Sequence, residues 1–217
     1  MHALPVFHAL RDTQPDAEIA WAVQPEFAGL LAGLPGLGRI FRFERRGGTR
    51  AWISLLSGIR AWAPDWAVDA QGNAKSALVT IGSGARRRSG LHPRDWRERF
   101  AACVLTDHAP ALEGPLVHAM QRMHALARHV ASGSRSGNPE RRDPGLSQAE
   151  LDSGHARLDG LVGSQSAPIA ILHLSSPRDV RSWPIRSFES LARSLAGRGC
   201  QVLVLSGPEE SVEGRGV

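Results

Sequence analysis

One carboxylate, Asp69, stands where it could take part in chemistry. It closes the apolar segment Trp66–Asp69, which is typical of a short buried strand, and the turn residues Gln71 and Gly72 follow it. Open α/β sheets bind ligands beyond the carboxyl ends of their strands, so Asp69 could act on a substrate. Aspartate is also a favoured turn residue, and of the two roles we favour capping of this turn.

Positive charge is the second chemical feature of the chain. The formal net charge is +5, the sequence pI is about 10.7, and Lys75 is the only lysine among the cationic residues. Arginine-rich surfaces suit phosphate groups or an anionic membrane face, although an arginine-biased genome would give the same composition. No nucleic-acid partner is predicted, because no aromatic-interleaved basic stripe or helix-turn-helix pattern is present. The run Arg86–Arg88 could face an anionic substrate or lipid, but we favour its interpretation as a solvated loop.

Metal and disulfide chemistry are not predicted. Cys103 and Cys200 lie far apart without a Cys-x-x-Cys spacing, which favours reduced, buried thiols, and the nine histidines are scattered. No apolar run reaches the ~20 residues of a membrane-spanning helix, and no basic segment followed by an apolar stretch opens the chain. We therefore expect a cytoplasmic protein without a metal or another cofactor.

The elements around Asp69 alternate between helices and strands. Helices are predicted at 2–11, 25–32, 52–62 and 73–81, and strands at 17–23 and 66–69. Such alternation predicts an α/β fold with a parallel sheet covered on both faces.

A change of character between residues 132 and 166 divides the chain. Turn formers without apolar periodicity indicate a linker there, with a weak helix at 148–161. A strand at 167–174, a helix at 184–195 and a strand at 201–205 then begin a second α/β domain. We expect an N-terminal domain over 1–131, a linker over 132–166 and an incomplete C-terminal domain over 167–217. Both ends look cut, since no strand precedes the first helix and one β-α-β unit cannot bury both faces of its sheet.

Several segments in this order resemble glycosyltransferase family 9, the lipopolysaccharide heptosyltransferases. Each is weak alone, but together they extend over nearly the whole chain apart from the linker. The matching segments are His2–Leu10 with Pro15–Ile19, Val68–Gly72 with Lys75–Ala77, Arg97–Glu98 with His118–Arg122, and Leu172–Ser176 with Arg181–Pro184 and Gly207–Glu210.

The resemblance implies a GT-B architecture, in which two Rossmann-like domains face each other across a cleft. It also implies inverting transfer of heptose from ADP-heptose to the inner core of lipopolysaccharide, at the cytoplasmic face of the inner membrane. Such transfer needs a general base, stabilisation of the departing diphosphate and exclusion of water. The implied partners are the nucleotide sugar, the inner-core acceptor and, peripherally, an anionic membrane face.

The resemblance also assigns residues to the two substrates. On the donor side, Ser175 and Ser176 match a hydroxyl pair that binds phosphate, Arg181 stands where the family usually has lysine, and Glu210 matches an acidic position near the nucleoside. Without the resemblance, the two serines would be interpreted as turn caps and the arginine as solvated. On the acceptor side, which carries carboxylates and phosphates, the candidates are Gln71, Lys75 and Arg122.

Two family segments are not found in this sequence. The proposed catalytic base belongs to a Ser-x-x-Gly-Asp segment that ends the strand before the first helix, so it would lie before Met1. The diphosphate-binding Asp-x-Gly-x-x-His segment is missing as well. We therefore expect this polypeptide to be inactive by itself. The rival hypotheses are a non-catalytic remnant or module that binds acidic glycolipid and, less favoured, a basic protein associated with nucleic acid.

Overall fold

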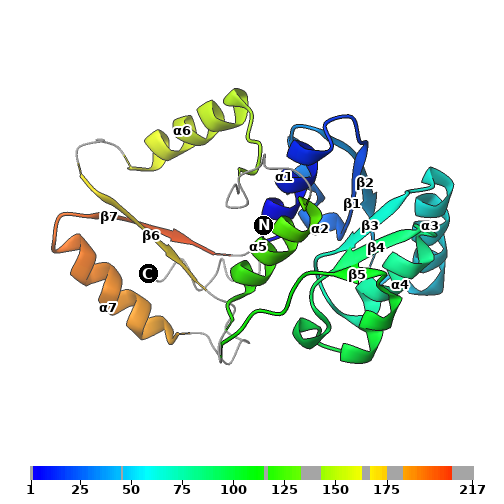
Figure 1. Ribbon diagram of the computed structural model, residues 1–217. Helices are drawn as coiled ribbons and strands as arrows, with labels where there is room; N and C mark the ends of the chain where they lie inside the picture. The colour runs from blue at the N-terminus through cyan, green and yellow to red at the C-terminus, as the bar shows by residue number, and fades with distance from the viewer. Residues whose placement is uncertain are drawn as a thin grey trace. The chain divides into compact units, whose positions relative to one another are not determined.

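The structure is a computed structural model, and it describes residues 2–44, 46–114, 117–132, 143–162, 167–174 and 183–206 (Figure 1). The chain divides into two compact units, Met1–Leu146 and Ser147–Val217, which we describe separately. The domain limits expected from the sequence, 1–131, 132–166 and 167–217, remain a prediction.

The first unit is an alternation of helices and strands. Its helices are α1 (Leu4–Thr13), α2 (Pro25–Ala28), α3 (Gly48–Trp62), α4 (Ala74–Gly82) and α5 (Ala119–Val130), with short 3-10 helices η1 (Gly29–Leu31), η2 (Pro93–Asp95) and η3 (Arg99–Val104). Its strands are β1 (Ile19–Val23), β2 (Leu37–Arg42), β3 (Trp66–Asp69), β4 (Arg87–Gly90) and β5 (Asp107–His108).

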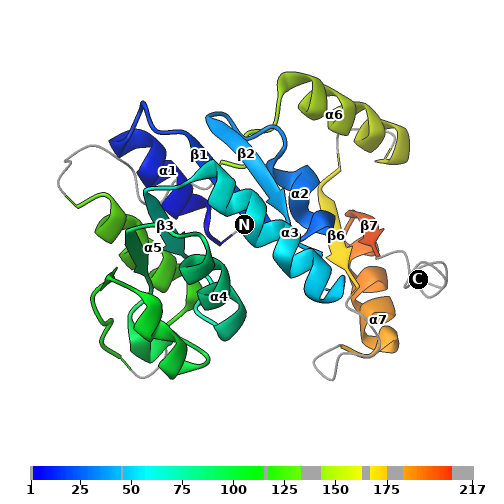
Figure 2. The same cartoon turned by 90° about the vertical axis from the view of Figure 1, so that its right-hand side faces the viewer.

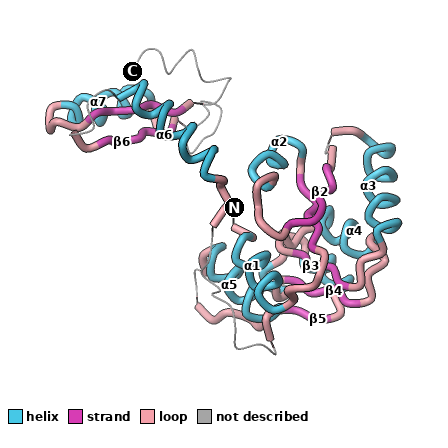
Figure 3. The backbone as a smooth tube through the Cα atoms, turned by 90° about the horizontal axis from the view of Figure 1, so that it is seen from above, coloured by secondary structure: helices cyan, strands magenta, loops and turns pink. Residues whose placement is uncertain are grey.

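All strand pairs of this unit are parallel. β1 pairs with β2, with Trp21 opposite Ile40, and β3, β4 and β5 form a second sheet in which Val68 is opposite Ser89. Helices α1 and α5 cover one face of the strands and α3 and α4 the other, as Figure 1 and the view from above in Figure 3 show. In Figure 2, α3 and α4 lie in front of the strands. The predicted parallel sheet with two covered faces is confirmed.

Strands β1 and β3 belong to separate sheets, and both line one groove. Each therefore has one edge that pairs within its sheet and a second edge turned toward the groove.

The core of the first unit lies between α1, α5 and the strands. Leu4 is 1% exposed and Leu126 on α5 is 0% exposed, and α1 packs along α5. The Phe7 ring stacks on Trp21 of β1 with a centroid separation of 5.9 Å. These contacts bury the apolar face of each helix and thereby fix the two helices on one side of the strands.

The second unit contains α6 (Gln148–Val162), β6 (Ile169–His173), α7 (Ile185–Ala196) and β7 (Gln201–Leu205). β6 and β7 are parallel, with Ile169 opposite Gln201, and α7 packs against both strands. The predicted strand, helix and strand of this unit are confirmed.

Most of the helices and strands were predicted from the sequence, but four were not: strands β2, β4 and β5 and helix α5. Helix α5 nevertheless carries a clear helical signal, because its buried residues Met123, Leu126, Ala127 and Val130 recur with i, i+3, i+4 and i+7 spacing.

Candidate functional site

An open groove of about 1610 Å³ is the candidate site of the first unit. Its apolar part is lined by α1, β1 and β3. Its polar part lies beyond the carboxyl end of β3, where the lining residues include Asp69, Gln71, Lys75, Asp95, Arg97, Glu98 and Arg122. Ligands of open α/β sheets bind at such edges.

Asp69 caps the turn that follows β3. Its side chain is buried, and its Oδ1 atom accepts the N–H groups of Gln71 and Gly72, both at 2.9 Å. The Thr80 hydroxyl donates to Oδ2 at 3.3 Å. Gly72 has φ +67°, a left-handed conformation that suits glycine at this turn. The favoured interpretation of Asp69 as a turn cap is confirmed, and with both oxygens occupied the carboxylate is badly placed to act as a base.

The start of α4 is fixed by two caps. Asn73 Oδ1 accepts the N–H groups of Lys75 and Ser76 at 3.0 Å, and the Ser76 hydroxyl accepts the Asn73 N–H in return. Glu98 Oε2 accepts the Ala74 N–H at 3.0 Å. Because the early N–H groups of this helix are already bound, an anion at this edge has to be recognised by side chains.

Lys75 is exposed, and within the part of the chain that the structure describes its ammonium group has no hydrogen-bond or ion-pair partner. Gln71 is exposed as well, and only its backbone N–H is engaged. The backbone at both positions is thus held firmly while the two side-chain heads are available to a ligand. That combination suits recognition of an acceptor's carboxylate or phosphate.

Arg122 reaches the same groove from the first turn of α5. His118 caps this helix, accepting the Met120 N–H at 3.2 Å. Arg122 Nε lies 3.2 Å from Asp95 Oδ1, an ion-pair distance, although the N–H is not aligned for a hydrogen bond. Among the described residues, the Nη atoms of Arg122 have no partner. Its forked end is therefore available for bidentate contact with an anion.

The structure thus gathers all three predicted acceptor residues on one groove, although their contact with an acceptor remains a proposal. Sequence reasoning missed the residues that hold them: Asp95 and the buried Trp96, whose indole N–H donates to the Leu91 carbonyl at 3.1 Å. Glu98 was part of a matching segment but had no assigned role. A tryptophan between charged residues, at 94–99, was the available signal for an inward-facing segment.

His92 follows the groove residue Leu91 in sequence and is not a source of positive charge. The rings of His92 and His108 meet edge to face with their centroids 4.8 Å apart. Burial, the neighbouring His108 and the charge of Arg94 hold the pKa of His92 below its ordinary value. His92 is therefore neutral at neutral pH, and an anion would rely on arginine and lysine.

The predicted donor residues, Ser175, Ser176, Arg181 and Glu210, lie outside the described residues. The elements that flank three of them in sequence are described. β6 ends at His173, and α7 begins at Ile185 with Pro184 as its N-cap.

The arginine run 86–88 corrects an expectation, because it is not a solvated loop. Arg87 and Arg88 open β4, and the Arg88 guanidinium donates to the carbonyls of Val104 and Ala85 at 2.6 and 2.7 Å. Arg87 lies over the Trp66 ring, 3.9 Å from its centroid, and forms an ion pair with Asp107 at 3.2 Å.

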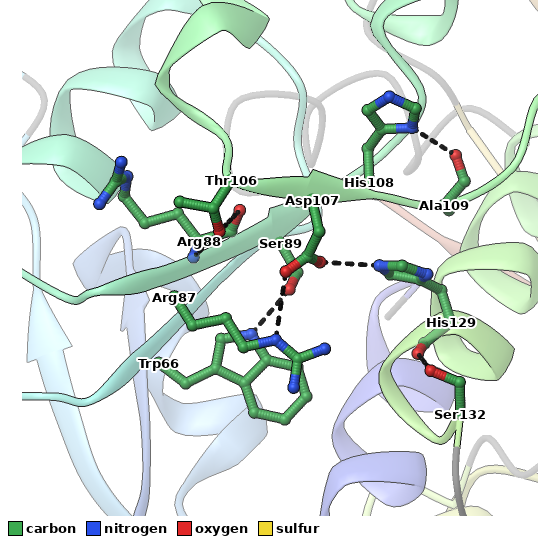
Figure 4. A network of polar contacts seen from close by, with 10 residues as sticks. All are labelled: Trp66, Arg87, Arg88, Ser89, Thr106, Asp107, His108, Ala109, His129 and Ser132. Atoms are coloured by element: carbon green, nitrogen blue, oxygen red, sulfur yellow. Dashed lines mark hydrogen bonds and ion pairs between the residues drawn. The ribbon is translucent and has the colours of Figure 1, made fainter.

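Asp107 joins this strand to helix α5 (Figure 4). Its Oδ1 atom is 2.8 Å from His129 Nε2, and Trp66 Nε1 donates to the neighbouring Ser89 hydroxyl at 2.8 Å. Burial raises the pKa of Asp107, but hydrogen bonds from Ser89, His129 and Arg87 outweigh burial and hold the pKa below its ordinary value. The network lies at the amino ends of β3, β4 and β5, away from the candidate edge, so its role is to stabilise the unit.

The cysteines require a second correction. Both are free, but Cys103 is exposed and Cys200 is only partly buried, so the expectation of two buried thiols was wrong. Within the described ranges, no cluster of three or more histidine, cysteine, aspartate or glutamate residues could hold a metal ion. In the same ranges, the helices are too short or too polar to cross a membrane.

Comparison with known proteins decides the family. The family model described as glycosyltransferase family 9 (heptosyltransferase) matches residues 52–216, which is well over half of the chain. The chain belongs to this family. Among curated proteins, no significant match was found.

Solved structures agree with this family at the level of the fold. Escherichia coli heptosyltransferase WaaC with ADP is 20% identical with a TM-score of 0.68, over 96% of this chain and 63% of that one. A family 9 glycosyltransferase from Veillonella parvula has a TM-score of 0.76 at 12% identity, over 100% and 62%. Escherichia coli ADP-heptose heptosyltransferase II has a TM-score of 0.64 at 20% identity, over 96% and 61%. The chain has the expected GT-B type of fold, and it spans less than two thirds of the length of each of these structures.

Proposed function

We propose that the complete protein transfers heptose from ADP-heptose to the inner core of lipopolysaccharide with inversion. The match to family 9 over residues 52–216 carries this proposal. It is supported by a similar structure, Escherichia coli WaaC, which was solved with ADP-2-deoxy-2-fluoro heptose. We place the protein in the cytoplasm, peripheral to the inner membrane, and propose no metal or cofactor.

The groove of the first unit is the proposed acceptor site. Gln71 and Lys75 line it with side-chain heads that have no partner among the described residues. Arg122 lines it as well; its Nε atom pairs with Asp95, while its Nη atoms have no described partner. An inner-core acceptor carries carboxylates and phosphates, and a lysine with a forked arginine supplies complementary charge-assisted hydrogen bonds. The first domain would therefore hold the acceptor.

The second unit is the proposed donor side. Ser175 and Ser176 follow β6, Arg181 precedes α7, and Glu210 follows β7. Hydroxyl groups after a strand, together with a guanidinium before a helix start, suit a diphosphate. Their roles as donor-binding residues are proposed from the family resemblance.

Turnover with ADP-heptose tests the proposal. The full-length protein, including any coding sequence that flanks these residues, should release ADP when ADP-heptose and a deacylated inner-core acceptor are both present. Turnover only with a different sugar nucleotide would contradict the donor assignment. The 217-residue chain, which carries neither the Ser-x-x-Gly-Asp nor the Asp-x-Gly-x-x-His segment, should show no turnover.

The second candidate function is a non-catalytic module that binds acidic glycolipid. The Lys75 ammonium group and the Nη atoms of Arg122, which have no partner among the described residues, favour it as well, because binding through them requires no donor. It predicts that the acceptor binds but that no ADP is released by any form of the protein.

A further inference from the structure

The segment Pro93–Val104 has two chemically different sides. It consists of the short helices η2 and η3, which pack against each other. Its acidic residues face inward. Asp95 is 16% exposed and pairs with Arg122, and Glu98 is 34% exposed and binds the start of α4.

The other side of the segment is cationic and apolar. Arg94 and Arg99 are exposed. Phe100 is 76% exposed, the largest exposed fraction of any large hydrophobic side chain that the structure describes. We call Arg94, Arg99 and Phe100 the outer rim. Arg97 belongs to the inner side, because it lines the groove and its Nε atom pairs with Glu98 Oε1 at 3.4 Å.

A single exposed phenylalanine is ordinary on a protein surface, but its surroundings here are not. Arg94 and Arg99 accompany it within seven residues, while both carboxylates of the segment have partners on the inner side, Asp95 with Arg122 and Glu98 with Arg97 and the Ala74 N–H. An apolar ring among cations is complementary to the interface of a bilayer that contains anionic lipids, where the ring enters the acyl boundary and the cations contact phosphates. A neutral or basic protein partner would not match this charge.

We propose that the outer rim docks on a bilayer containing anionic phospholipids. The inner side of the same segment frames the groove, so docking would place the groove mouth beside the membrane. This consequence rests on the proposed function, because it matters for an acceptor that is a membrane glycolipid. The docking itself requires neither donor nor acceptor.

The expected contributions follow from the two kinds of contact. Each arginine near an anionic surface strengthens binding about fivefold, and the effect declines with salt. Burial of the phenylalanine ring contributes about tenfold or more. Neither change should affect folding, because the side chains of the outer rim are exposed.

The test uses the 217-residue chain and vesicles without any acceptor. One set of vesicles is pure phosphatidylcholine, and in the other phosphatidylglycerol replaces a third of it. Co-sedimentation measures binding. Cys103, exposed and three residues beyond Phe100, carries an environment-sensitive fluorophore in a Cys200→Ser background and reports contact of the outer rim with the bilayer.

We expect binding to the anionic vesicles, with a blue shift of the label, and little binding to the neutral ones. Phe100→Ala should weaken binding about tenfold. Glutamine at both Arg94 and Arg99 should weaken it about 25-fold. The matched controls are Ile53→Ala and Arg50→Gln, which change an exposed apolar and an exposed cationic residue on α3 and should bind like the parent chain.

Three results would overturn the proposal: equal binding to neutral and anionic vesicles, no loss with Phe100→Ala, or an equal loss with the α3 controls. Dissociation of a dimer by Phe100→Ala in sedimentation velocity, without vesicle binding, would identify the outer rim as a contact between copies instead. Failure of ADP release in the full-length protein would contradict the proposed function and leave the vesicle result standing.

Discussion

The substitution Asp107→Asn is expected to destabilise the first unit by about 2 kcal/mol. The carboxylate contacts His129 Nε2 at 2.8 Å and Arg87 Nε at 3.2 Å, and the side chains are 20% and 47% exposed. A hydrogen bond to a charged group contributes about 1.5 kcal/mol or more, and we assign that to His129. The half-exposed Arg87 pair contributes about 0.5 kcal/mol. In the variant, the amide NH₂ group faces one of the two donors, and the carbonyl oxygen that faces the other carries no charge. Both contributions are therefore largely lost.

The effect should also depend on pH. The folded-state pKa of Asp107 lies below its ordinary value, so on acidification the unfolded chain takes up this proton first. The stabilisation is therefore complete well above the ordinary carboxyl pKa of about 3.9 and is lost as the pH falls through the folded-state value. The stability difference between parent and variant should shrink below about pH 4.

Urea unfolding of the 217-residue chain, followed by tryptophan fluorescence at neutral and acidic pH, measures this difference. Asp16→Asn is the matched control, because Asp16 is exposed in the same unit and its side chain has no hydrogen bond or ion pair with any residue that the structure describes. It should change stability by less than about 0.5 kcal/mol. If Asp107→Asn changes stability no more than this control, or if the difference persists in acid, the assignment of the network is refuted.

Three further substitutions test the groove. Asp69→Ala leaves two backbone N–H groups and the Thr80 hydroxyl without their acceptor and should cost about 3 kcal/mol or more in urea unfolding; a cost below about 1 kcal/mol would contradict the turn-cap role. Trp96→Phe keeps the apolar contact but removes the indole donor from a buried carbonyl, so calorimetry should show a loss of about 1–2 kcal/mol, and an unchanged melting temperature would speak against the bond. Asp95→Ala frees the guanidinium of Arg122, and isothermal titration with deacylated inner core should show affinity reduced about fivefold, since one more long side chain must be ordered on binding. Tighter binding would show instead that Asp95 acts only by neutralising that charge.

Local sequence determined most of the elements because their signals are short-range. The strand at 66–69 and the strand at 201–205 were predicted with the observed limits, since each is an apolar run bounded by turn residues. The cap role of Asp69 followed from its position before Gln71 and Gly72. Helix α5 was missed although its spacing is plainly helical, so that omission was an error of interpretation rather than a lack of information.

Other features could not be derived from neighbouring residues. The run at 86–88 suggests solvent because three arginines are costly to desolvate, yet Arg87 and Arg88 lie in a strand. The loss of hydration of Arg87 and Arg88 is compensated by contacts with distant residues: the Trp66 ring, the Asp107 carboxylate and the Val104 carbonyl. Partners so far apart in sequence leave no local pattern.

In the candidate site too, some features follow from the sequence and others only from the tertiary structure. The sequence alone determined the family, the types of the groove residues and the turn that carries Gln71 and Lys75, because these depend on residue identity and short spacing. Only the tertiary structure brought Arg122, some fifty positions later, to the same groove, and only it showed that Asp95, Trp96 and Glu98 face inward while Phe100 faces outward. The direction of a side chain in an irregular segment depends on what packs beneath it. Here Trp96 is buried against the Gly72 turn and donates to the Leu91 carbonyl, and Glu98 binds the start of α4.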